Sequence, residues 1–434
     1  MSDWLSAPAG PLRGEVRVPG DKSISHRAIM FASLAEGTSR VSGFLEGEDT
    51  RATARAFAQM GVRVDTSQPN ERIVHGVGLL GLRAPSTPID CGNAGTGMRL
   101  LAGLLAGQAF DSILAGDESL SRRPMRRVID PLQRMGARIE AEQGGVPPLR
   151  ITGGRALHGI DYELPVASAQ VKSAILLAGL YANGETRVRE PHPTRDYTES
   201  MLRAFGCAIE FGPGWARLTG ANRLRATDIS VPADFSSAAF FIVAASIVPG
   251  SEVVLRDVGI NPRRTGLLHA LRAMGADINA VNSRGVGGEP VADLVVRHAR
   301  LRGVDVPLEL VPDMIDEFPI LFVAAGAAQG TTRIRGAAEL RVKESDRIAV
   351  MAAGLRQLGI RIEETSDGAV IEGGQFGGGE VDSAGDHRCA MSFAVAALLA
   401  ASAVKIGDCA NVATSFPGFI ELANASGFAL RANA

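Results

Sequence analysis

Five segments of the chain place basic, acidic and hydroxyl side chains directly before stretches of small and apolar residues. The first is GDKSISHR, from Gly20 to Arg27, which puts Lys22 and Ser23 beside a predicted helix start. Unpaired amides and the positive dipole end of a helix attract anions. This segment therefore indicates a phosphate site, although the first glycine of a Walker A loop is missing. A serine-capped helix with solvated charges explains the segment equally well when it is taken alone.

Two further segments share these features. CGNAGTGMR offers two glycine turns through which backbone amides can approach a ligand, and GDESLSRRPMRR follows it with Arg123. VASAQVKSA brings Ser168, Gln170 and Lys172 to another predicted helix start. A cap explains the serine, but the helix dipole disfavours a lysine in the first turn unless an anion lies nearby.

The remaining segments lie in the second half of the chain. VPDMIDEFPI contains Asp313 and is followed along the chain by RVKESDR, with Lys343, Glu344 and Arg347. The last segment, GDHRCAMS, contains Arg388. Taken alone, the acids of VPDMIDEFPI can be explained as helix caps, and the alternating charges of RVKESDR can be explained as a solvated face. If all five segments converge, their summed field is strongly positive with few carboxylates. Such a site suits two phosphorylated substrates and leaves Asp313 and Glu344 as proton carriers.

The elements that must hold these segments form an internal repeat. Each copy is a helix rich in alanine and glycine, a glycine turn and a β-branched strand, followed by an amphipathic helix that ends in a glycine and another strand. The copies begin near Ser25, Thr96, Ala169, Ser236, Glu317 and Cys389. The first helix of each copy is apolar all round and is expected to be buried. Six copies favour two pseudo-threefold lobes of three units each over one open α/β sheet.

The division between the lobes is expected near Val231. Residues 21–231 would form the first lobe, and residues 1–20 with 232–434 the second, with the active site in the cleft between them. The length of 434 residues suits two lobes.

Composition excludes several classes of protein. A net charge of −2 argues against a general nucleic-acid binder, and 46% hydrophobic with 21% charged residues excludes a disordered chain. The four cysteines are widely spaced, which argues against a zinc site and suits a reducing cytoplasm. The N-terminal residues do not read as a signal peptide, and the longest apolar runs are too short to span a membrane.

Together, GDKSISHR, GNAGTGMR, SAQVKSA, RVKESDR and DHRCAMSF resemble the 5-enolpyruvylshikimate-3-phosphate synthase family, in the family's order and over essentially the whole chain. SAQVKSA, NPRRTG and RDYTE are similar to the second of its two bacterial classes. The resemblance implies a two-lobed inside-out α/β barrel, the enolpyruvyl transferase fold. It also implies transfer of the enolpyruvyl group of phosphoenolpyruvate to the 5-hydroxyl of shikimate-3-phosphate. Phosphate is released through a tetrahedral intermediate, in the synthesis of chorismate and aromatic amino acids.

The resemblance also implies roles for individual residues, carried over motif by motif. Shikimate-3-phosphate would be bound by Lys22, Ser23, Arg27, Ser168, Ala169, Gln170, Arg195, Asp313 and Lys343. Phosphoenolpyruvate, or the herbicide glyphosate in its place, would be bound by Lys22, Gly95, Arg123, Gln170, Arg347 and Arg388. The catalytic residues would be Asp313, Glu344 and Lys22, and neither a cofactor nor a metal is implied.

The chain departs from the family pattern at two positions. Thr414 stands where the other class has a lysine that binds phosphoenolpyruvate, so no cation is expected there. Tyr197 stands where the related class often has histidine, and its role is left open.

Three alternatives remain beside this interpretation. A UDP-sugar enolpyruvyl transferase of cell-wall synthesis shares the fold but typically has a loop cysteine, which GDESLSRRPMRR lacks. A non-catalytic sugar-phosphate-binding protein would have lost Asp313 and Glu344. A kinase is disfavoured by the missing Walker A loop. The expected partners are the two small substrates, with no nucleic acid and no membrane, for a monomer in the cytoplasm.

Overall fold

The structure is a computed structural model that describes residues 3–66, 68–220 and 223–433. The chain forms two compact units. The first unit comprises Gly20–Val231 with Val286–Glu289, and the second comprises Met1–Pro19, Pro232–Gly285 and Pro290–Ala434. Each unit encloses its own hydrophobic core, so each is described by itself.

Three buried helices form the centre of the first unit: α1 (Lys22–Leu34), α3 (Gly95–Ala106) and α5 (Ala169–Gly179). They pack closely because small residues line their contacts. A Cβ added at Gly103 of α3 would lie 2.1 Å from the carbonyl oxygen of Ala174 in α5, so only glycine fits at this crossing. This close approach explains why alanine and glycine dominate the repeat.

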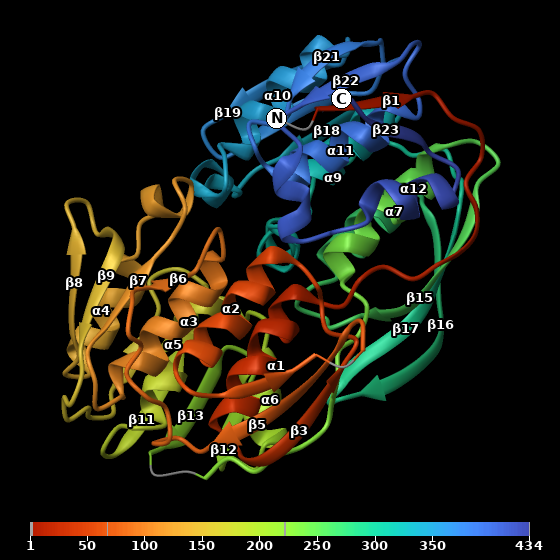
Figure 1. Cartoon of the computed structure of the whole chain (residues 1–434). Coiled ribbons are helices and arrows are strands. Elements are labelled where there is room, and N and C mark those ends of the chain that lie inside the picture. Colours follow the sequence, from red (N-terminus) through yellow and green to blue (C-terminus); the bar gives the residue numbers. More distant parts are fainter. Residues whose placement is uncertain (1–2, 67, 221–222, 434) are drawn as a thin grey trace. The chain divides into compact units, whose positions relative to one another are not determined.

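Three four-stranded sheets and three outer helices complete the first unit (Figure 1). In each sheet a short edge strand runs parallel to its neighbour, and two antiparallel strands follow. The sheets, in spatial order, are β14 (Ile229–Ser230), β3 (Glu36–Ser42), β5 (Glu71–Val77) and β4 (Arg63–Asp65); β6 (Ile89–Asp90), β7 (Ser112–Ala115), β9 (Val146–Thr152) and β8 (Arg138–Glu142); and β10 (Asp161–Glu163), β11 (Glu185–Arg189), β13 (Trp215–Thr219) and β12 (Ile209–Gly212). The outer helices are α2 (Glu48–Gln59), α4 (Arg126–Arg134) and α6 (Tyr197–Ala204).

The second unit repeats this plan. Its buried helices are α7 (Phe235–Ile247), α9 (Phe318–Ala327) and α11 (His387–Ala397), and its outer helices are α8 (Gly266–Ala273), α10 (Arg347–Gln357) and α12 (Phe419–Ala425). Its sheets are β16 (Asp277–Val286), β17 (Glu289–Arg297), β15 (Glu252–Gly259) and β2 (Arg13–Val16); β18 (Thr331–Ile334), β20 (Gly368–Glu372) and β19 (Arg361–Thr365); and β21 (Gly379–Asp382), β22 (Val404–Gly407), β1 (Asp3–Ala7) and β23 (Ala429–Asn433). The N-terminal strand β1 lies between β22 and β23, so both ends of the chain belong to this unit (Figure 1).

The predicted fold class, α/β with six two-helix units, is confirmed. The six glycines after the outer helices all adopt the left-handed conformation, with φ from +84° to +111°: Gly61, Gly136, Gly206, Gly275, Gly359 and Gly427. Helix α1 begins at Lys22, three residues before the predicted Ser25, so Lys22 and Ser23 lie inside its first turn. No helix in the described ranges is long and apolar enough to cross a membrane.

Candidate active site

The N-terminus of α1 holds the first predicted cation. The Asp21 carboxylate caps the helix by accepting a hydrogen bond from the Ile24 amide at 2.8 Å. Lys22 follows, and its Nζ lies 2.9 Å from Oδ2 of Asp49, a buried residue of α2. A lysine at a helix N-terminus opposes the dipole, and this carboxylate offsets the repulsion.

Arg27 lies one turn further along α1 and is buried. Its Nε donates to Thr198 Oγ1 at 2.7 Å, its Nη2 to Ser173 Oγ at 2.8 Å, and its Nη1 to the Ser23 carbonyl at 3.0 Å. Burial and the nearby charge of Arg195 lower the pKa of Arg27 to about 10. These hydrogen-bond partners are neutral, and the nearby carboxylates of Glu199 and Asp21 favour the charged form of Arg27.

The starts of α3 and α5 meet through Gln170. Its Oε1 accepts from Arg99 Nη1 at 2.7 Å, and its Nε2 donates to Thr96 Oγ1 at 2.8 Å. Gly95 opens α3, and a Cβ added there would lie 3.2 Å from Nη1 of both Arg99 and Arg123. Within the first unit, the structure thus links Gly95 with Arg123 and Arg99, and Arg99 with Gln170.

Neutral oxygens also orient Arg123. Its Nη2 donates to Asn93 Oδ1 at 2.6 Å and to Ser119 Oγ at 3.0 Å. At the start of α5, the Ser168 hydroxyl accepts from the Val171 amide at 3.4 Å and so caps the helix, and the buried Ala169 is the first helical residue. The cap predicted for Ser168 is confirmed.

Lys172 does not add to a positive field, which corrects the expectation from the sequence. It is buried, and its Nζ lies 2.8 Å from both Glu190 Oε2 and Glu199 Oε1. Burial alone would lower the pKa of Lys172, but the two carboxylates outweigh burial and raise it. The anion that a lysine in this position requires is therefore supplied by the chain itself.

In the second unit Arg347 is buried at the start of α10. Its Nε lies 2.8 Å from Asp386 Oδ2, its Nη2 lies 2.6 Å from Glu344 Oε2, and its Nη1 lies 3.5 Å from Asp316 Oδ1. Burial opposes ionisation, but these carboxylates outweigh it and raise the pKa of Arg347. Nη1 is nevertheless buried without a hydrogen-bond partner in the described structure, which leaves a donor for a ligand.

The other predicted residues of this unit lie at neighbouring helix starts. The Nζ of Lys343 lies 3.7 Å from Asp316 Oδ1, and Nη1 of Arg388 lies 3.7 Å from Glu317 Oε1. Asp313 is buried in the 3₁₀ helix Pro312–Met314, with its Oδ2 3.5 Å from Nη1 of Arg263. Each predicted proton carrier thus lies beside an arginine: Asp313 beside Arg263, and Glu344 beside Arg347.

The expectation of few carboxylates is wrong for this unit, because ion pairs accompany its predicted cations. The site residues that sequence reasoning missed are Asp49, Arg99, Arg264, Asp316 and Glu317. Arg99 ends the motif GNAGTGMR and Arg264 lies in NPRRTG, while Asp316 and Glu317 lie in VPDMIDEFPI, where the sequence favours helix caps. Asp49 lies 27 residues from Lys22 and offered no local signal.

Tyr197 and Thr414, the two positions that depart from the family pattern, both donate hydrogen bonds within the chain. The Tyr197 hydroxyl donates to Asp21 Oδ2 at 3.4 Å, which ties the start of α6 to the cap of α1. Thr414 is buried, and its hydroxyl donates to the Asn411 carbonyl at 2.7 Å.

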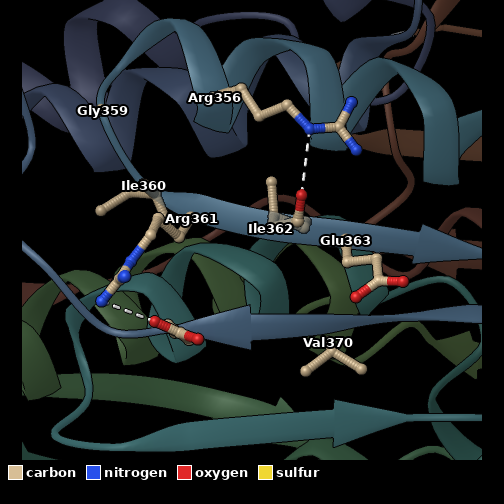
Figure 2. A pocket seen from close by; sticks show the side chains of 8 residues that line it. Arg356, Gly359, Ile360, Arg361, Ile362, Glu363 and Val370 are labelled. Atoms are coloured by element: carbon tan, nitrogen blue, oxygen red, sulfur yellow. Dashed lines mark hydrogen bonds and ion pairs between the residues drawn. The ribbon is translucent and has the colours of Figure 1, made fainter.

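Two hollows of the surface lie away from these residues. Figure 2 shows one of about 450 Å³ along α10 and β19, where Arg356 Nε donates to the Ile362 carbonyl at 3.0 Å and Arg361 pairs with Glu372 at 2.7 Å. The other, of about 700 Å³, lies at the C-terminal ends of α1, α3 and α5. No predicted site residue lines either hollow. The described residues hold no group of three or more histidine, cysteine or acidic side chains placed to bind a metal.

Comparison with known proteins points to one family. The family model for EPSP synthase, 3-phosphoshikimate 1-carboxyvinyltransferase, matches residues 7–422. The chain is 67% identical over 427 residues to the 3-phosphoshikimate 1-carboxyvinyltransferase of Xanthomonas euvesicatoria pv. vesicatoria (strain 85-10), covering 98% of this chain and 97% of that relative. The corresponding protein of Xanthomonas oryzae pv. oryzae (strain PXO99A) is also 67% identical, over 429 residues, with 99% and 98% covered.

Solved structures agree with this result. EPSP synthase from Acinetobacter baumannii is 51% identical with a TM-score of 0.90, and all of both chains is covered. The enolpyruvyl transferase NikO from Streptomyces tendae is 18% identical with a TM-score of 0.80, covering 100% of this chain and 99% of that one. At 18% identity, the similarity to NikO shows only that the two chains share a fold.

Proposed function

Because the chain belongs to the EPSP synthase family, we propose how its residues divide the work of that family's reaction. It is a transferase of the shikimate pathway, and it moves the enolpyruvyl group of phosphoenolpyruvate to the 5-hydroxyl of shikimate-3-phosphate. The products are 5-enolpyruvylshikimate-3-phosphate and phosphate. The observation that carries the assignment of residues is that Lys22, Arg27 and Arg347 lie in the first turns of their helices, where backbone amides and cationic side chains together favour a bound anion.

Shikimate-3-phosphate is assigned to the first unit for most of its contacts. Lys22, Ser23 and Arg27 lie within two turns of α1, and the charge of Arg195 lies close enough to Arg27 to lower the pKa of Arg27. Two like charges held near each other are stabilised by a bound anion. The start of α5, with Ser168, Ala169 and Gln170, would contact the remaining polar groups of this substrate, and Asp313 and Lys343 of the second unit would complete the set.

Phosphoenolpyruvate is assigned to residues of both units. In the first unit it would meet Lys22, Gly95, Arg123 and Gln170, where the glycine allows close approach of the ligand to the helix start. In the second unit it would meet Arg347 and Arg388. Arginine binds phosphate and carboxylate through two parallel hydrogen bonds, and the buried Nη1 of Arg347 has such a bond to give.

The acids Asp313 and Glu344 would move the protons of the reaction. The 5-hydroxyl loses its proton as its oxygen attacks C2 of phosphoenolpyruvate, and C3 gains a proton to give the tetrahedral intermediate. C3 then loses a proton as phosphate leaves. General acid–base catalysis typically contributes about 10²–10⁴ in rate, and the cations supply positioning and electrostatic stabilisation.

The protein is further proposed to act as a monomer in the cytoplasm, without cofactor or metal. The experiment measures phosphate release from phosphoenolpyruvate with shikimate-3-phosphate as the acceptor. A parallel reaction with a UDP-sugar acceptor tests the cell-wall alternative, and a reaction without acceptor measures background hydrolysis. Release that depends on shikimate-3-phosphate alone is expected, and the absence of turnover at saturating substrates would overturn the assignment.

A further inference from the structure

Beyond the residues assigned to substrates, we propose that Arg264 is a positioning residue for phosphoenolpyruvate binding. It acts through two carboxylates, Asp316 and Glu317, which in turn lie beside the cations Arg347 and Arg388. The inference rests on the proposed function, because it takes those two arginines as ligands of phosphoenolpyruvate.

Arg264 is buried just before α8 and joins the starts of two other helices. Its Nη2 lies 3.3 Å from Oδ1 of Asp234, the capping residue of α7, and also donates to the Ser236 hydroxyl. Its Nη1 lies 3.5 Å from Asp316 Oδ2 and 3.6 Å from Glu317 Oε1, just before α9. Both terminal nitrogens of the guanidinium therefore face groups of the chain itself.

Asp316 forms the first of the two connections. Its Oδ2 faces Arg264, while its Oδ1 lies 3.5 Å from Arg347 Nη1 and 3.7 Å from Lys343 Nζ. One carboxylate is therefore shared by three cations. Arg264 is a buried partner of Oδ2, and this contact helps to set the direction in which Oδ1 points.

Glu317 forms the second connection. Its Oε1 accepts from the Ser236 hydroxyl and lies 3.6 Å from Arg264 Nη1 and 3.7 Å from Arg388 Nη1. The side chain is 1% exposed, and its Oε2 has no hydrogen-bond partner in the described ranges. A buried carboxylate is costly unless positive charge compensates it, and Arg264 shares that task with Arg388.

The charges predict what Arg264 does for the substrate. A carboxylate beside a ligand-binding arginine orients the arginine but also competes with an anionic ligand for it. Arg264 draws part of the negative charge of Asp316 and Glu317 to itself. Without it, the two carboxylates would pair fully with Arg347 and Arg388, and phosphoenolpyruvate would bind more weakly.

The first test compares Arg264→Gln with the control Arg272→Gln. Arg272 is an exposed arginine of α8 that donates only to the Ile278 carbonyl, at 3.2 and 3.3 Å, among the contacts that the structure shows. Arg264→Gln should raise the KM for phosphoenolpyruvate by about tenfold, equivalent to about 1.4 kcal/mol. The KM for shikimate-3-phosphate and kcat should change less, and the control should match the parent. Equal changes in all three constants would overturn the proposal.

A second pair of variants separates positioning from a general effect on folding. Lysine keeps the charge of Arg264 but lacks the planar fork that faces both carboxylates, so Arg264→Lys should raise the same KM by about threefold. In the double variant Arg264→Gln/Glu317→Gln the carboxylate beside Arg388 is gone while Asp316 remains, and the KM should return part of the way toward the parent value. Additive losses in the double variant would contradict the mechanism. If Arg264→Gln fails to fold, an unchanged KM in Arg264→Lys is the overturning result.

Failure of this inference is distinguishable from failure of the proposed function. Calorimetric titration of phosphoenolpyruvate in the absence of shikimate-3-phosphate measures affinity without turnover, because the acceptor of the enolpyruvyl group is missing. If the parent binds and transfers but the Arg264 variants match Arg272→Gln, only the positioning role is wrong. If Arg388→Met binds phosphoenolpyruvate as tightly as the parent, the assignment of Arg388 is wrong and the Arg264 inference falls with it.

Discussion

Replacing Lys22 by methionine should remove two things at once, because the ammonium serves both the proposed ligands and the fold. Its Nζ lies 2.9 Å from Asp49 Oδ2, and Asp49 Oδ1 is buried with no hydrogen-bond partner in the described ranges. Breaking a buried ion pair costs roughly 3–5 kcal/mol. The Lys22 side chain is 18% exposed, which points to the lower end of that range. Loss of activity in Lys22→Met alone would therefore be ambiguous.

The second substitution Asp49→Asn separates the two effects. In Lys22→Met/Asp49→Asn no unpaired carboxylate is left, so most of the lost free energy of unfolding should return. Activity should not return, because the cation proposed to bind both anionic substrates is still absent. Loss of such a contact costs roughly 2–5 kcal/mol, or about 30- to 5,000-fold in kcat/KM.

Thermal unfolding and phosphate release are measured on the parent, both single variants and the double variant. Asp49→Asn alone is the matched control, since it leaves the lysine in place, and its kcat/KM should stay within about tenfold of the parent. A double variant that regains kcat/KM together with stability would refute the reasoning. It would show that Lys22 acts only as the structural partner of Asp49.

Three further predictions follow from the same structure. A Cβ at Gly95 would lie 3.2 Å from two guanidinium nitrogens, and this glycine is not in the left-handed region, so Gly95→Ala should fold normally. The methyl group narrows the pocket assigned to phosphoenolpyruvate, and glyphosate is longer than phosphoenolpyruvate. Gly95→Ala should therefore raise the inhibition constant of glyphosate more than the KM for phosphoenolpyruvate. A parent enzyme that is insensitive to millimolar glyphosate would contradict this prediction. Asp313→Asn and Glu344→Gln should each lower kcat by about 10²–10⁴, and Glu344→Gln should still bind shikimate-3-phosphate in a calorimetric titration; joint loss of binding would indicate a structural ion pair instead. Burial and the neighbouring charges of Lys22 and Arg27 lower the pKa of His26 to about 3. Below about pH 6.5, His26 therefore binds a proton in the unfolded chain but not in the folded chain. The free energy of unfolding should therefore fall by about 1.4 kcal/mol per pH unit as the pH drops toward 3, and a urea titration of His26→Asn should show a shallower slope.

The fold was predictable because its signals are local. Glycine after each outer helix, small residues in each inner helix and β-branched strands recur six times, and each signal acts within a few residues. The close crossing at Gly103 and the left-handed φ of Gly61 show the physical reasons for that recurrence. The predicted site segments likewise lie at helix starts, because the same repeat places them there.

The partners of the charged side chains were not predictable in the same way. Lys172 pairs with Glu190, 18 residues away, and Lys22 pairs with Asp49, 27 residues away, on separate elements. A sequence shows how many charges a segment carries but not which distant carboxylate reaches them. The expected surplus of positive charge was wrong for this reason, whereas the placement of Gln170 beside Gly95 needed only the two helix starts to meet.

The two units hold their arginines by different chemistry, and this difference bears on how each unit binds an anion. Arg27 and Arg123 donate to hydroxyl, amide and carbonyl oxygens, which carry no charge. Arg347 is oriented by carboxylates, which fix its geometry more firmly but compete with the ligand. An anion at Arg27 meets a guanidinium whose hydrogen-bond partners carry no charge, while an anion at Arg347 competes with carboxylates already in direct contact. Of these carboxylates, Asp316 also contacts the buried guanidinium of Arg264, which is placed to draw part of its charge away from Arg347.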